Sequence, residues 1–149
     1  MTPDGSGPLL FAYDGSDLAG NAITEAGRQL RAGRDTVVLT IWEPFNVGFL
    51  PVGGIEFDAA RSDEVRTAAE ETAAYGASLA EAAGFRAQSM AAEAAPTWKG
   101  IIEAADKQDA SLIVLGSHGR SGLTHLVGSV ASAVAAHSQR SVLIVHRRH

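Results

Sequence analysis

Residues 111–129 read S-L-I-V-L-G-S-H-G-R-S-G-L-T-H-L-V-G-S, an apolar run followed by a stretch rich in glycine. The run from Leu112 to Leu115 is apolar without alternation, as expected of a strand that is covered on both faces of its sheet. Glycine occupies positions 116, 119, 122 and 128 of the stretch that follows. Because glycine has no Cβ, it lets the backbone approach a neighbour or a ligand closely. The segment therefore predicts a buried strand that leads into a specialised connection.

Strand-like and helix-like patterns alternate along the rest of the chain. Short apolar runs predict further strands at 9–13, 36–42, 85–91 and 142–145. Apolar or small residues at helical spacing predict helices of about fifteen residues from 16 or 17, then at 58–83, from 96, and at 129–137, with a long loop at 43–57. This alternation predicts one α/β domain over residues 1–149, with a parallel sheet and right-handed crossovers.

The composition describes a globular protein, because 46% of the residues are apolar and 19% are charged. A net charge of −5 argues against nucleic acid as the main partner, since phosphate binding depends on basic surface. There is no cysteine, which excludes disulfides, thiolate catalysis and cysteine-ligated zinc. The sequence contains neither a signal-peptide pattern at its start nor an apolar run long enough for a membrane span. We expect a cytoplasmic protein without membrane attachment.

Two segments with binding chemistry follow predicted strands. Asp14-Gly15-Ser16 comes after the first strand, and the glycine stretch comes after the fourth. In an open parallel sheet, ligands bind beyond the carboxyl ends of the strands, where the strand order reverses. Gly128 and Ser129 begin a helix, whose free N–H groups favour an anion. These features predict a phosphate site, with Asp14 as acceptor for a ribose hydroxyl or a metal-bound water. The alternative is that the glycines serve only a tight turn and close helix packing.

Residues 109–134, D-A-S-L-I-V-L-G-S-H-G-R-S-G-L-T-H-L-V-G-S-V-A-S-A-V, resemble the signature of the universal stress protein family. The segments A-Y-D-G-S at 12–16 and T-V-V-L-T-I-W-E-P at 36–44 resemble the same family at matching places. The resemblance covers essentially the whole chain. It implies a Rossmann-like three-layer fold with a five-stranded parallel sheet in the order 3-2-1-4-5 and four helices. It also implies a homodimer formed through the last strand, Ser141 to His146.

The resemblance implies a site for ATP or another adenine nucleotide, with Mg²⁺ carried in by the nucleotide. Members that bind ATP share the pattern Gly, two residues, Gly, nine residues, then Gly-Ser/Thr. Ala12 and Asp14 would then lie at the ribose and base, and the main chain of Ile41 would contact adenine. The residues implied to hold phosphate and ribose are Gly116, Ser117, His118, Gly119, Arg120 and Ser121, with Gly128, Ser129 and Val130 at the phosphate end.

One departure from this pattern concerns the interval before Gly128. Eight residues separate it from Gly119, where the ATP-binding members have nine. In a fully helical connection, losing one residue would rotate Gly128 by about 100° and turn the phosphate-binding groups away. Gly122 lies in this interval and gives the connection room to shorten. We therefore expect Gly128 and Ser129 still to face the crevice.

These observations are compatible with three candidate functions. The favoured one is a nucleotide-binding, homodimeric regulator of a stress response. The second is an ATP-independent interaction module with the same fold and a vestigial phosphate loop. The third, an enzyme, is the least supported, because the sequence places no base or orienting carboxylate beside His118. We expect no catalytic residue, no metal site built by the protein, and at most slow ATP hydrolysis or autophosphorylation.

Overall fold

The computed structural model of the chain describes residues 7–43, 55–118 and 127–147, with side chains left out at 55–61. Five parallel strands form one sheet in the order β3-β2-β1-β4-β5, as the sequence predicts. The strands are β1 (Leu9–Ala12), β2 (Asp35–Trp42), β3 (Arg86–Glu93), β4 (Leu112–Gly116) and β5 (Ser141–Val145). The helices in the described part are α1 (Asp17–Gln29), α2 (Ile55–Ala82), α3 (Thr97–Gln108) and α4 (Ser129–His137).

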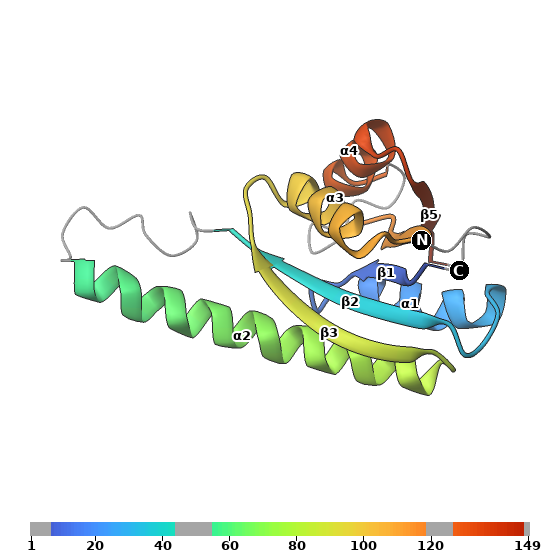
Figure 1. Cartoon of the computed structure of the whole chain (residues 1–149), viewed down its shortest axis with the longest axis horizontal. Helices are drawn as coiled ribbons and strands as arrows, with labels where there is room; N and C mark the ends of the chain where they lie inside the picture. Colours follow the sequence, from blue (N-terminus) through green and yellow to red (C-terminus); the bar gives the residue numbers. More distant parts are fainter. Residues whose placement is uncertain (1–6, 44–54, 119–126, 148–149) are drawn as a thin grey trace.

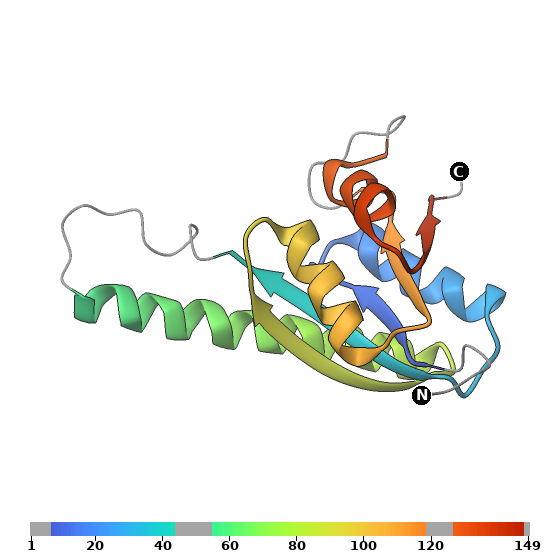
Figure 2. The same ribbon diagram turned by 45° about the horizontal axis from the view of Figure 1, so that its top comes forward.

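The helices cover the two faces of the sheet in pairs (Figure 1). On one face, Leu9 and Phe11 of β1 are buried against α1 and α2, and the Phe11 ring lies 5.7 Å from that of Phe85 between centroids. On the other face, Leu10 packs toward α3 and α4. Figure 2 shows α3 and α4 together on this face. Because side chains of β1 alternate between two buried layers, the strand is apolar throughout, as its sequence indicates.

Small residues let α2 lie close to the sheet. Its buried positions are Ala69, Ala73, Gly76 and Ala80, which recur at helical spacing. A Cβ on Gly76 would come within 2.7 Å of both Tyr13 Cδ2 and Val38 Cγ1. The close packing of α2 on the sheet therefore depends on glycine at position 76.

The predicted element boundaries need correction, most clearly in three places. Helix α2 begins at Ile55 and not at 58, so the predicted loop at 43–57 is shorter, and residues 44–54 of it lie outside the described residues. Strand β3 extends to Glu93, because it pairs with β2 at every one of its eight positions. Pro96 is the N-cap of α3 and does not lie in its first turn. Pairing across the sheet thus lengthens β3 beyond what its alanine-rich sequence favours.

No helix in the described ranges is long and apolar enough to cross a membrane.

Candidate functional site

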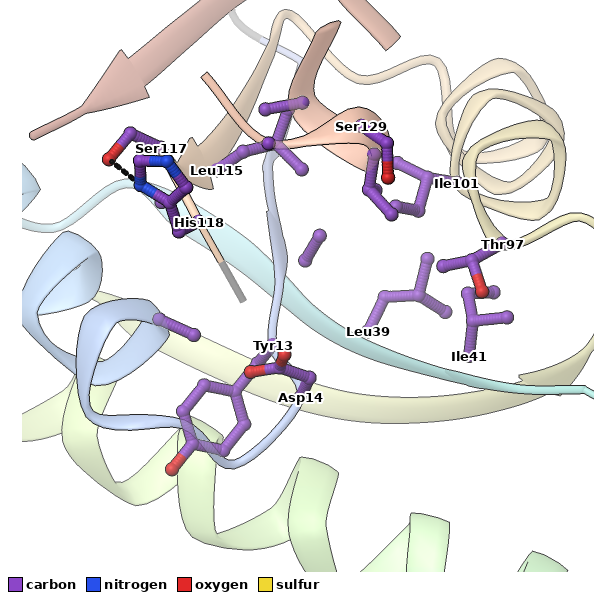
Figure 3. Close-up of a pocket in the computed structure, with 16 residues that line it drawn as sticks. Tyr13, Asp14, Leu39, Ile41, Thr97, Ile101, Leu115, Ser117, His118 and Ser129 are labelled. Carbon is purple, nitrogen blue, oxygen red and sulfur yellow. Dashed lines mark hydrogen bonds between the residues drawn. The ribbon is translucent and has the colours of Figure 1, made fainter. Parts of the chain in front are cut away.

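A pocket lies beyond the carboxyl ends of β1 and β4, where the strand order reverses. Its volume is about 200 Å³, whereas a single water needs only about 10–15 Å³ by such a measure. The pocket is therefore large enough for a ligand and is not a packing defect. Figure 3 shows the residues that line it: Ala12, Tyr13, Asp14, Ala19, Leu39, Ile41, Thr97, Ile101, Leu115, Gly116, Ser117, His118, Gly128, Ser129, Val130 and Ala131.

Most of the residues that the sequence singles out for the site meet in this pocket. They are Ala12, Asp14, Ile41, Gly116, Ser117, His118, Gly128, Ser129 and Val130. Gly119, Arg120 and Ser121 lie outside the described residues. Gly128 and Ser129 line the same pocket as Gly116 even though the interval before them is one residue short.

Gly116 and Gly128 allow one chain segment to lie directly on another. The Gly128 N–H donates to the Ser117 carbonyl at 2.6 Å, and a Cβ on Gly128 would sit 3.1 Å from the same oxygen. A Cβ on Gly116 would sit 3.1 Å from the Leu18 carbonyl oxygen. Neither glycine has a positive φ. Close packing between chain segments therefore explains why positions 116 and 128 are glycine. It also holds the start of α4 against the end of β4.

The N-terminus of α4 offers hydrogen-bond donors to the pocket. Its N-cap is Gly128, which provides no side-chain cap, and its first turn contains no acidic residue. The first N–H groups of a helix have no intrahelical acceptor. With Ser129 and Val130 lining the pocket, these donors and the positive end of the helix dipole favour a bound anion.

Ser117 and His118 form a buried polar pair at the end of β4. Their exposed fractions are 3% and 6%, and the Ser117 hydroxyl lies 3.2 Å from Nδ1 of His118 (Figure 3). Nε2 of His118 is buried without a hydrogen-bond partner among the residues that the structure describes. The sequence predicts no base beside His118. Among the described residues, the structure places the Ser117 hydroxyl next to the His118 ring but no carboxylate in hydrogen-bond contact with it.

Asp14 is positioned by the turn that follows β1. Its Oδ1 accepts a hydrogen bond of 2.9 Å from the Ser16 N–H, and the Ser16 hydroxyl in turn caps α1 through the N–H of Ala19. Gly15 has a φ of 84°, a conformation that favours glycine. The Asp14-Gly15-Ser16 segment is thus a fixed turn that holds a carboxylate at the edge of the pocket.

Tyr13, the residue before Asp14, is buried and lines the pocket. Burial raises the pKa of the Tyr13 phenol, with smaller contributions from Tyr75, Asp14 and Asp17. The Tyr13 backbone is tied to β2, since its carbonyl accepts a hydrogen bond of 2.8 Å from the Thr40 hydroxyl. Tyr13 therefore stays neutral at physiological pH and contributes to the shape of the site.

Sequence reasoning missed one side of the pocket. Thr97, the first residue of α3, lines it beside Ile41 (Figure 3). Both the N–H and the hydroxyl of Thr97 donate to Oε2 of Glu43, at 2.9 and 2.8 Å. Pro96 marks the start of this helix in the sequence, and a helix start after a strand is the signal that could have pointed to Thr97. The other lining residues not predicted are Tyr13, Ala19, Leu39, Ile101, Leu115 and Ala131.

The family model of the universal stress proteins matches residues 6–146. The chain belongs to the universal stress protein family. A universal stress protein of Mycolicibacterium smegmatis is 32% identical over 143 residues, which are 95% of this chain and 46% of that relative. The chain thus spans about half the length of the curated relatives it matches.

Solved structures share this fold. The hypothetical protein MJ0577 superposes with a TM-score of 0.78 over 97% of this chain and 98% of its own, at 20% identity, which shows the shared fold. A universal stress protein in complex with cAMP has a TM-score of 0.58 at 26% identity, over 94% of this chain and 96% of its own.

Proposed function

We propose that this universal stress protein binds ATP, or another adenine nucleotide, in the pocket at the carboxyl ends of β1 and β4. The observation that carries the proposal is the placement of an uncapped helix N-terminus in a pocket at the reversal of strand order. Such a pocket joins a donor-rich end for phosphates to apolar walls for a base.

The lining residues divide according to the parts of a nucleotide. Leu39, Ile41 and Ile101 form apolar walls that suit the base, and the Asp14 carboxylate suits a ribose hydroxyl. The phosphates would lie against Gly128, Ser129 and Val130, with Ser117 and His118 beside them. By resemblance, Gly119, Arg120 and Ser121 would complete this end.

The metal in this proposal belongs to the nucleotide. No cluster of three or more His, Cys, Asp or Glu side chains occurs in the part of the chain that the structure describes. We propose that Mg²⁺ arrives with ATP, held mainly by phosphate oxygens and water.

The complex of a related universal stress protein with cAMP supports an adenine ligand. That relative is 26% identical to this chain, and the two structures match over 94% of this chain. An adenine ring and a phosphate are common to cAMP and ATP, so the same apolar walls and helix N-terminus would suit both.

The proposed role is regulation by binding and not catalysis. Ser117 and His118 resemble a nucleophile and a base, but catalytic pairs of this kind need a third group that orients the base. No hydrogen bond between His118 and a carboxylate is found among the described residues. We propose a cytoplasmic, homodimeric stress-response regulator whose state depends on the bound nucleotide, with β5 as the dimer contact.

The experiment that tests nucleotide binding is titration calorimetry with MgATP on the purified chain. We expect a micromolar dissociation constant, equivalent to about −8 kcal/mol. Absence of binding would favour the second candidate, an interaction module that keeps the fold and works without nucleotide.

A further inference from the structure

The polar side chain on one side of the pocket, Thr97, has no spare hydrogen-bond donor. Thr97 lies there with Leu39, Ile41 and Ile101. The Thr97 hydroxyl carries a single proton, which it donates to Oε2 of Glu43 at 2.8 Å. The Thr97 N–H donates to the same oxygen at 2.9 Å. Both donors of Thr97 are therefore used, and its hydroxyl oxygen can only accept.

Glu43 holds the Thr97 hydroxyl in the orientation in which its oxygen can only accept a hydrogen bond. The residue follows β2 and is partly buried, and its carboxylate bonds to the start of α3. An acid at a helix N-terminus is favourable, so this contact stabilises the orientation of the Thr97 hydroxyl. A freely rotating hydroxyl could serve a donor or an acceptor, but this one is restricted to accepting.

The two polar ends of the pocket have opposite character. The α4 end, with Ser129 and Val130, offers N–H donors that favour an anion. The Thr97 end has an acceptor hydroxyl with a carboxylate behind it, which disfavours phosphate. A nucleotide would therefore place its phosphates at α4 and its base among Leu39, Ile41 and Ile101, next to Thr97.

We propose that Thr97, oriented by Glu43, makes the pocket selective for a purine with a 6-amino group over one with a 6-oxo group. This inference rests on the proposed nucleotide binding and specifies it. The amino group of adenine donates a hydrogen bond to the Thr97 oxygen. The keto oxygen of hypoxanthine or guanine places an acceptor against an acceptor and leaves both without a partner, which is the costly arrangement.

The first test compares ATP with inosine triphosphate on the unmodified chain. The two nucleotides have the same ribose and phosphates and differ in the purine at position 6, where an amino group with an unprotonated N1 is replaced by an oxygen with a proton on N1. We expect calorimetry to give a dissociation constant about tenfold lower for ATP, the size of effect that one hydrogen bond typically produces. Equal affinity for the two nucleotides would overturn the inference.

The second test uses variants at Thr97. Thr97→Val keeps the shape and the backbone bond to Glu43 but removes the hydroxyl, so ATP should bind about tenfold more weakly while inosine triphosphate is unaffected. Thr97→Ser keeps the hydroxyl and should keep the preference for ATP. Thr24→Val, an exposed change on α1, is the matched control and should leave both affinities unchanged.

The outcomes separate this inference from the proposal on which it rests. If Thr97→Val weakens both nucleotides equally, Thr97 has only a structural role and the selectivity claim is wrong, while nucleotide binding stands. If the unmodified chain binds neither nucleotide, the proposed function fails and the selectivity fails with it. A ratio of affinities near ten in the unmodified chain and near one in Thr97→Val supports the inference.

Discussion

Single residues in this site differ in how far the sequence reveals them. Asp14 and Gly128 could be predicted, because each lies in a short local pattern at the end of a strand or the start of a helix. For Thr97 the sequence offers only the helix start at Pro96, because the side chain that orients it, Glu43, is 54 residues away. The sequence does not show why position 128 must be glycine, because the Ser117 carbonyl oxygen comes next to it only in the folded chain.

Gly128→Val tests this close approach. The Cβ of the new side chain would lie 3.1 Å from the Ser117 carbonyl oxygen, and valine is a poor N-cap. We therefore expect a loss of stability of about 1–2 kcal/mol. The added methyl groups crowd the start of α4, and affinity for ATP should fall by tenfold or more, about 1.4 kcal/mol.

The control for this variant is Ala135→Val, which adds the same side chain at an exposed position of α4. It should cost only the difference in helix propensity, about 0.6 kcal/mol, and leave binding intact. Calorimetry and thermal melting measure both effects. A folded Gly128→Val chain with unchanged affinity would show that the phosphates bind elsewhere.

Among the secondary-structure elements, the helices follow local patterns and the strands depend more on their partners. The spacing of small residues predicts α2, and the Asp14-Gly15-Ser16 turn predicts the start of α1. The sequence indicates β3 only weakly, because R-A-Q-S-M-A-A-E contains no β-branched or aromatic residue. Its full length arises from pairing with β2 along eight positions, which no local property of the segment encodes.

Gly76→Ala tests how tightly α2 is packed on the sheet. Alanine favours a helix over glycine by about 1 kcal/mol, so helix propensity alone predicts a gain. The new Cβ would lie 2.7 Å from Tyr13 Cδ2 and Val38 Cγ1, and displacing these buried groups typically costs about 1–3 kcal/mol. We expect the packing cost to prevail, with a net loss of about 1 kcal/mol or more.

Gly20→Ala is the matched control on α1, because its Cβ would make an ordinary contact of 3.5 Å with Leu79 Cδ1. It should stabilise the chain by about 0.5–1 kcal/mol in urea unfolding. A stabilised Gly76→Ala variant would show that α2 can move away from the sheet without cost.

In the molecule as a whole, the order of the strands determines which strands lie at the edges of the sheet and can pair with another chain. Alternation of elements along the sequence indicates a parallel sheet, whereas the order 3-2-1-4-5 comes from the family resemblance and is confirmed by the structure. This order places β5 at an edge, with Ser141 exposed and Val142, Leu143 and Ile144 half-buried. The strand contains neither the proline nor the lysine that often protects an edge.

We therefore predict that two copies associate through β5. Backbone N–H and carbonyl groups on the outer side of an edge strand favour pairing with a second strand. Sedimentation velocity at tens of micromolar protein should show a dimer that dissociates on dilution. A monomer throughout that concentration range would contradict the prediction.

The most direct test of nucleotide binding in this pocket is titration of the purified, nucleotide-free chain with MgATP in a calorimeter. The pocket places an uncapped helix N-terminus and the Asp14 carboxylate around one ligand-sized volume, so we expect a saturable isotherm with a micromolar dissociation constant. At a free ATP concentration of one hundred times that constant, the chain should gain about 2.7 kcal/mol of stability. No heat of binding and no rise in melting temperature at millimolar MgATP would contradict it.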